Sequence, residues 1–185
     1  MNKYTYVRNN PLRYIDPDGH DITFATPGLE ALYHRFATES TTFAEELDAD
    51  RKPNPNFVVN VVERALRQND EKSSGDATVS RKGQQVSVTV YIDSRGRTSD
   101  STVAHEQGHV KDARTNINQL MQDGARTKKN KGAPGAPTHN ERPEEKRADK
   151  FRDQVPKEQQ AYRRAEKERR KQEQLEKKRK KKDEQ

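Results

Sequence analysis

The amino-acid sequence predicts a mostly helical α+β domain with a small β-hairpin and a charged C-terminal tail. Apolar residues recur at helical spacing over much of the first 155 residues. Two short segments, 77–81 and 86–92, instead alternate with the period of two that is typical of strands. A chain of 185 residues has room for about one domain, so we expect the helices and the hairpin to share one core.

Two helices are expected before the hairpin, over residues 28–50 and 56–69, with a Pro-rich break at 52–55. Pro27 suits the first turn of the first helix. The second helix is predicted because its apolar residues recur at i, i+1, i+4 and i+5, which gives a helix an apolar stripe. These residues are Phe57, Val58, Val61, Val62, Ala65 and Leu66.

The hairpin turn is expected at residues 82–85, and further helices follow it. One helix is predicted over 102–116, and a shorter one over 117–122 that a following Asp-Gly pair would end. Residues 127–143 are rich in Lys, Gly and Pro and therefore predict a loop. From Glu144 onward the residues favour a helix again.

The positive charge of the chain is concentrated in its last 30 residues. Residues 156–185 contain 13 Lys and Arg and 7 Asp and Glu, a net charge of +6, whereas the whole chain carries +7. We therefore expect a nearly neutral domain over residues 21–155 and a basic tail that is helical or disordered. Because the tail mixes acids with bases and has almost no aromatic residues to stack on bases, nucleic acid is not an expected partner.

Several classes of site and segment are excluded by composition. The chain has no cysteine, so a metal ion must be held by His, Asp or Glu. No apolar run approaches the ~20 residues of a membrane-spanning helix. The first six residues lack the apolar core of a signal peptide, so export through the general secretory route is not expected.

The most informative motif is His105-Glu106-Gln107-Gly108-His109, an H-E-x-x-H sequence. On a helix, residues four apart lie on one face, so both imidazoles can reach one Zn²⁺ ion. Glu106 would face a zinc-bound water and act as the general base. Glycine is unfavourable within a helix, so Gly108 predicts that another backbone approaches closely there.

A catalytic zinc site usually has three protein ligands, and the sequence leaves the third open among His139, Glu141, Glu144 and Glu145. The sequence from Glu145 to Asp149 reads E-x-x-A-D, and these two carboxylates share a helix face.

In this motif the chain resembles the gluzincin metallopeptidases, in which a downstream helix supplies a glutamate ligand. The resemblance implies a zincin-like fold in which Glu145 is the third ligand. It also implies that Asp149 hydrogen-bonds a ligand histidine. In zincins generally, an edge strand before the metal-binding helix pairs with extended substrate, and residues 86–92 are placed for that role.

Three other residues near the motif have open roles. Asp112 follows His109 by three residues and would either support that histidine or simply lie on the helix surface. Tyr91 and Arg114 are candidates to stabilise an oxyanion, although no motif singles them out.

Residues 1–20 resemble the C-terminal end of the RHS-repeat core, whose closing pattern runs Y-x-Y-V-x-N-N-P and then D-P-x-G. The matching residues are Tyr4, Tyr6, Val7, Asn9, Asn10, Pro11, Asp16, Pro17 and Gly19. In that family the core forms a β-shell around a C-terminal toxin and cleaves it off just after this motif. The family usually has Leu after the D-P-x-G, where this chain has His20. The resemblance implies a toxin over residues 21–185, with the parent shell and a cognate immunity protein as partners.

Together these patterns predict an RHS-associated toxin, delivered into a target cell by a specialised secretion system, that cleaves a protein as a zinc endopeptidase. One alternative is a toxin whose basic tail binds nucleic acid or an acidic membrane, with a non-catalytic metal site. Another is a metallohydrolase that cleaves amide bonds in peptidoglycan.

Overall fold

The computed structural model describes residues 22–65, 75–93, 98–130, 138 and 141–183. Among these residues the chain has five helices and a four-stranded mixed sheet, which confirms the α+β class. Residues 1–20, which carry the RHS resemblance, lie outside the described residues.

The sheet has the strand order β1-β2-β4-β3. Strand β1 (Ile22–Phe24) pairs in parallel with β2 (Phe57–Arg64), and β2 pairs in parallel with β4 (Gln85–Asp93). Strand β3 (Gly75–Lys82) runs antiparallel to β4 and forms an edge of the sheet. The predicted hairpin is therefore confirmed, and Gly83 takes a φ of 63° in its turn, a conformation that favours glycine.

The prediction of a helix over residues 56–69 is wrong, because residues 57–64 form strand β2. Phe57 and the following valines are aromatic and β-branched, and such side chains favour the pleated surface of a strand. Strand β2 has a parallel neighbour on each side, and valines lie on both of its faces, so the alternation that marks a strand is blurred. The part of the prediction over 66–69 lies outside the described residues.

The single helix predicted over residues 28–50 is two helices, α1 (Pro27–Glu39) and α2 (Thr41–Asp50). Ser40 separates them in an extended conformation. Its backbone N–H donates to the end of α1, and its hydroxyl accepts from the backbone N–H of Phe43 in α2 at 3.1 Å. A serine that caps the start of a helix stabilises this break.

Three helices follow the hairpin: α3 (Asp100–Thr115), α4 (Ile117–Asn130) and α5 (Pro143–Asp183). The first confirms the helix predicted over 102–116. Helix α4 is longer than expected and runs through the Asp-Gly pair at 123–124, so the predicted end at that pair is wrong. Asp123 is buried against Arg147 of α5 at 2.9 Å, a tertiary contact that local propensity does not reveal.

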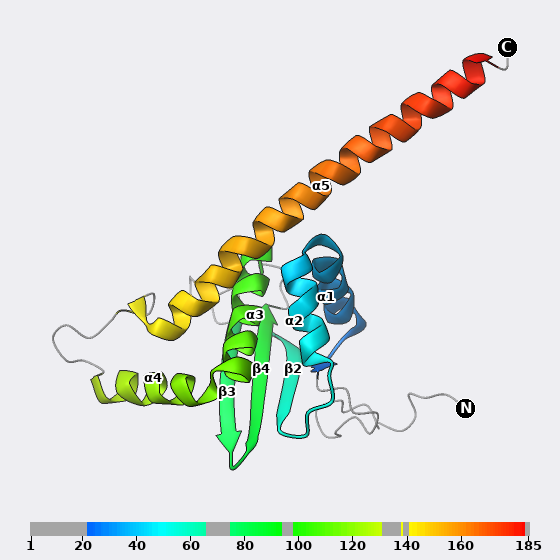
Figure 1. Cartoon of the computed structure of the whole chain (residues 1–185). Helices are drawn as coiled ribbons and strands as arrows, with labels where there is room; N and C mark the ends of the chain where they lie inside the picture. The colour runs from blue at the N-terminus through cyan, green and yellow to red at the C-terminus, as the bar shows by residue number, and fades with distance from the viewer. Residues whose placement is uncertain (1–21, 66–74, 94–97, 131–137, 139–140, 184–185) are drawn as a thin grey trace, which may run out of the picture.

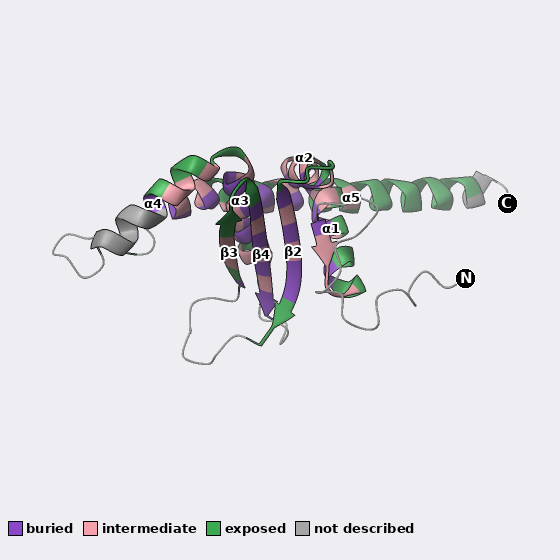
Figure 2. Cartoon of the chain, turned by 90° about the horizontal axis from the view of Figure 1, so that it is seen from below, coloured by how far each residue is buried: buried purple, intermediate pink, exposed green. Residues whose placement is uncertain are grey.

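The helices pack on the sheet and on one another around one core. Helix α3 contacts β3 and β4, α1 contacts β1 and β2, and α5 packs mainly on α3. Figure 1 shows α5 crossing the body of the molecule at α3. Figure 2 shows the buried residues gathered where the strands meet the helices. Five aromatic rings pack at the helical end of the core: Phe24, Tyr33, Phe36, Phe43 and Phe151.

Helix α5 continues without interruption through Pro156, and its contacts with the body extend beyond that residue. The Glu158 carboxylate accepts hydrogen bonds from Ser40 and Thr42 at the start of α2. Arg163 reaches Glu39 and Asp100. Past Arg163 the helix projects away from the body (Figure 1). Among the described helices, none combines the length and apolar character needed to cross a membrane.

Candidate metal centre

Helix α3 holds the H-E-x-x-H motif against the sheet. Ser99 caps the helix by accepting a hydrogen bond from the backbone N–H of Thr102 at 3.2 Å. Val103 and Val110 are buried in the core, which turns the opposite side of the helix toward α5. His105 and His109 lie one turn apart on that side with their rings perpendicular and their centroids 4.8 Å apart.

The crossing of α3 and α5 occurs at Gly108, as the sequence predicted. A Cβ atom at this position would lie 2.8 Å from Cα and 2.9 Å from the carbonyl oxygen of Ala148. The two backbones are therefore as close as they can be, with two small residues facing each other. Because Ala148 lies between Glu145 and Asp149, this close crossing carries both carboxylates to the histidines of α3.

Three donor atoms converge at the crossing: Nε2 of His105, Nε2 of His109 and Oε2 of Glu145. The two nitrogens are 3.2 Å apart, and the oxygen lies 3.2 Å from His105 and 3.6 Å from His109. Ligands at about 2.0–2.1 Å from a tetrahedral ion are roughly 3.3 Å apart, so this triangle has the dimensions of one face of a tetrahedral site. Two imidazoles and one carboxylate in this arrangement could hold a metal ion.

The electrostatics of the triangle favour a cation. Burial alone would lower the pKa of His109, but the carboxylates of Glu145 and Glu106 outweigh burial and raise that pKa. A cation bound between these groups would be stabilised by the same negative charges.

Glu106 lies beside the triangle and is only 5% exposed. Burial raises the pKa of its carboxyl to about 7, although His109 and His105 act in the opposite direction. The side chain packs against the first residue of β3, Gly75, where a Cβ would come within 3.0 Å of its Oε1 atom. The edge strand therefore begins directly against the carboxyl group that the sequence predicts as the general base.

Asp149 approaches His105 from the side opposite to Glu145. Its carboxylate lies 3.1 Å from Nδ1 of His105 and 2.7 Å from the guanidinium of Arg152. The first contact has the distance of an ion pair, but the ring N–H is not aligned with the carboxylate, so it is not a hydrogen bond. The predicted hydrogen bond between Asp149 and a histidine of the motif is therefore absent, and the two side chains form a close electrostatic contact instead.

Asp112 is buried but forms no hydrogen bond or ion pair with His109. Its carboxylate instead accepts from Arg147 of α5 at 2.7 Å and from Asn116 at 3.0 Å. Arg147 also binds Asp123 of α4. The structure thus makes Asp112 part of a buried contact that joins α3, α4 and α5, which is neither of the two roles expected from the sequence.

One residue of the motif has a role that the sequence did not suggest. Gln107 is fully buried, and its amide donates to Asp50 of α2 at 2.6 Å. The same carboxylate accepts from Arg114, which also binds Glu46. Because Gln107 points away from the histidines, this group fixes the rear of α3 to α2 while the front faces α5. Only the tertiary contact reveals it, since a glutamine carries no sequence signal of burial.

The other candidates from the sequence lie elsewhere. Arg114 is engaged with α2, and Tyr91 packs under the guanidinium of Arg64, on the sheet face opposite to α3. Neither is brought to the metal centre. Glu144 neighbours Glu145 but is not among the three converging donors, and His139 lies outside the described residues.

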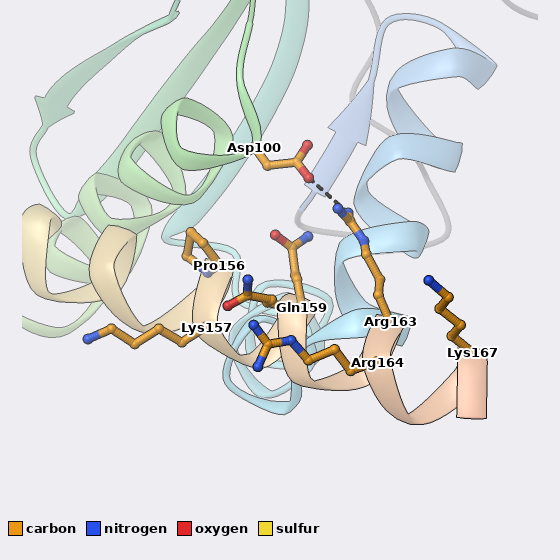
Figure 3. Close-up of a pocket in the computed structure, with 8 residues that line it drawn as sticks. Asp100, Pro156, Lys157, Gln159, Arg163, Arg164 and Lys167 are labelled. Atoms are coloured by element: carbon orange, nitrogen blue, oxygen red, sulfur yellow. Dashed lines mark hydrogen bonds and ion pairs between the residues drawn. The ribbon is translucent and has the colours of Figure 1, made fainter. Parts of the chain in front are cut away.

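A separate hollow of about 680 Å³ lies along α5, away from the three donor atoms. It is lined mainly by polar and cationic side chains of α5, together with Asp100 at the start of α3 (Figure 3). The described residues that line it include neither a histidine nor a carboxylate of the metal centre.

Comparison of the chain with family models, with curated proteins and with solved structures found no match.

Proposed function

We propose that this chain is a zinc-dependent endopeptidase in which His105, His109 and Glu145 are the metal ligands. The observation that carries the proposal is the convergence of these donors beside Glu106. Two imidazole nitrogens and one carboxylate oxygen are a ligand set that zinc uses in catalytic sites, with one position left for water or substrate.

A zinc ion held there supplies a Lewis acid that lowers the pKa of a bound water toward neutrality. The chain's own contribution is the carboxyl of Glu106. Its pKa of about 7 suits a group that takes a proton from water and returns it to the leaving amine. A divalent cation nearby would favour its carboxylate form, which is the form a base requires.

The position of strand β3 supports a peptide as the substrate. The sequence led us to expect this role for residues 86–92, but those residues belong to β4, which lies inside the sheet. The edge is β3, and it starts at Gly75 against Glu106. An extended peptide that pairs with the free side of β3 would therefore run past the general base.

The biological setting of the proposal depends on residues 1–20. Their resemblance to the end of the RHS core supports an effector toxin that is released from its parent shell and delivered into a target cell, with a cognate immunity protein in the producer.

The variant Glu106→Gln tests the proposal. It keeps the three proposed ligands, so we expect one zinc ion per chain to be retained while cleavage of an unfolded protein such as casein is lost. Toxicity on expression in bacterial cytoplasm should be lost with it. Glu30→Gln, at an exposed residue remote from the motif, is the matched control and should behave as wild type. Full protease activity in Glu106→Gln would contradict the proposal, and cleavage of peptidoglycan but not of protein would favour an amidase instead.

A further inference from the structure

The charges on α5 are sorted by the helix into distinct faces. Where α5 leaves the body, Arg169 and Arg170 both pair with Glu166 of the same helix, at 2.9 Å and 3.0 Å. Arg163 is held by Glu39 and Asp100 of the body. These arginines are neutralised by local partners and therefore contribute little to the outward field.

Another face of α5 carries five bases and two glutamines and is bordered by Glu168, and we call it the basic stripe. Its seven positions alternate in steps of three and four residues, so they follow one side of the helix. They are Lys157, Gln160, Arg164, Lys167, Lys171, Gln174 and Lys178. At 1.5 Å per residue the stripe is roughly 32 Å long.

All seven side chains of the stripe are exposed. Lys171 pairs with Glu168 at 2.7 Å, whereas Lys157, Arg164, Lys167 and Lys178 form no ion pair within the described part of the chain. Every acidic residue of this stretch, from Glu158 to Glu176, lies at other positions of the helix. The average composition of the tail therefore hides a one-sided positive surface.

The near end of the stripe borders the hollow along α5. Lys157, Arg164 and Lys167 line it, and Arg163 turns to Asp100 on the opposite wall (Figure 3). Gln159 also lines the hollow; it is 2% exposed, and its amide nitrogen is buried without a hydrogen-bond partner. The hollow thus offers free cations and an unused donor at the point where the stripe meets the body.

We propose that the basic stripe is a docking surface for the phosphate backbone of double-stranded nucleic acid. A straight cationic face of this length can follow phosphates without any contact to base edges. The mixed composition of residues 156–185 led us to expect no nucleic-acid binding, but the helix separates the mixed charges in space. The absence of aromatic residues from the stripe argues against single strands, which are bound by stacking, and not against a duplex.

Two other anionic partners fit the stripe less well. A membrane-bound helix needs a continuous apolar face beside its bases, whereas the exposed large apolar side chains of the described part of α5 are only Tyr162 and Leu175. A protein interface is depleted in lysine and built around apolar or aromatic anchors, whereas four of the seven stripe residues are lysines. Interfaces with nucleic acid are polar and strongly positive, as this surface is.

Binding of the full-length chain to a labelled 20-base-pair DNA duplex tests the proposal, with fluorescence anisotropy followed across a salt titration. The test variant is Arg164→Gln/Lys167→Gln/Lys178→Gln, which removes three unpaired cations of the stripe. The matched control, Lys52→Gln/Lys82→Gln/Lys180→Gln, removes three exposed cations elsewhere. Circular dichroism establishes that helix content is unchanged in both.

We expect the stripe variant to bind the duplex at least ten-fold more weakly at low salt. The plot of log K against log salt should also become less steep by roughly three, since each of the three lost phosphate contacts contributes about 0.9 to the slope. The control should change affinity by less than about three-fold, because its cations lie off the contact face. Glu106→Gln should bind DNA like the wild type, which separates this surface from the proposed active site. Equal losses in the stripe and control variants would overturn the proposal, as would no binding by the wild type. It would also be overturned if polyglutamate or phosphatidylserine vesicles bound the stripe more tightly than the duplex.

Discussion

At the scale of single residues, Glu145 is the side chain on which the candidate metal centre depends. It is the only carboxylate whose oxygen joins both motif histidines within the described part of the chain. Its neighbour Glu144 has the same chemistry but is not among the converging donors. A difference of one helix position, about 100° of rotation, therefore separates the two.

Glu145→Ala should lower zinc affinity by more than about 100-fold, because a direct ligand matters at least as much as the supporting groups whose loss costs 10–100-fold. Glu144→Ala is the matched control and should bind zinc as the wild type does. Titration of the metal-free protein with zinc against a competing chelator measures both. Normal zinc affinity in Glu145→Ala together with a loss in Glu144→Ala would show that Glu144 is the third ligand.

Asp50 is a second residue with a measurable signature, because burial raises the pKa of its carboxyl to about 6 from 3.8. The folded protein holds this proton more tightly than the unfolded chain does. Its contribution to stability is therefore complete below pH 4 and is lost as the pH rises to about 6, a change of about 3 kcal/mol.

Urea unfolding of the wild type and of Asp50→Asn between pH 4 and pH 7 isolates this effect. The free energy of unfolding of the wild type should fall relative to that of the variant as the pH rises. A difference between the two that does not vary with pH would show that Asp50 titrates normally.

At the scale of secondary structure elements, the crossing of α3 and α5 positions the site. Alanine is favoured over glycine within a helix by about 1 kcal/mol, so α3 alone would gain from Gly108→Ala. The added methyl group would instead meet the backbone of Ala148 at 2.8 Å and push the helices apart.

We expect Gly108→Ala to lower the free energy of unfolding by about 1–2 kcal/mol, since overpacking costs more than the helix gains. Zinc affinity should fall with it. Adding Ala148→Gly should not restore either property, because the clash is with backbone atoms. Gly28→Ala, where the nearest atom is 3.7 Å away, is the control and should be neutral or stabilising. A Gly108→Ala protein as stable as the control would show that the helices can separate without cost.

The same scale shows where sequence patterns succeed and fail. Helix α3 and the hairpin were predicted because their periodicity is strong and local. Strand β2 was predicted as a helix because its pairing partners, β1 and β4, are distant in sequence and because valines lie on both of its faces. The extension of α4 to Asn130 depends on a contact with α5, which no local pattern contains.

At the scale of the whole molecule, a bound metal ion would join α3 to α5 and so stabilise the fold. A ligand that binds only the folded state adds about 2.7 kcal/mol at a free concentration 100 times its dissociation constant. For a chain of this size that corresponds to a rise in Tm of roughly 5–10 °C.

Differential scanning calorimetry with zinc and with EDTA should show this rise for the wild type. His105→Ala should show none, because it lacks a donor, while Glu106→Gln should keep it. Equal transition temperatures with and without zinc in the wild type would mean that no metal bridges the two helices.

The sequence alone determined the α+β class, the helix that carries the two histidines and the glutamate of the H-E-x-x-H motif, and the need for a close backbone approach at Gly108. These features are local, because a helix places residues i and i+4 together whatever surrounds it. The tertiary structure decided which carboxylate meets the histidines, which strand forms the edge, how Gln107 fixes the rear of the helix, and how the charges of α5 face solvent. Each of these depends on contacts between residues far apart in the chain, and burial and pairing across such distances leave no periodic trace in the sequence.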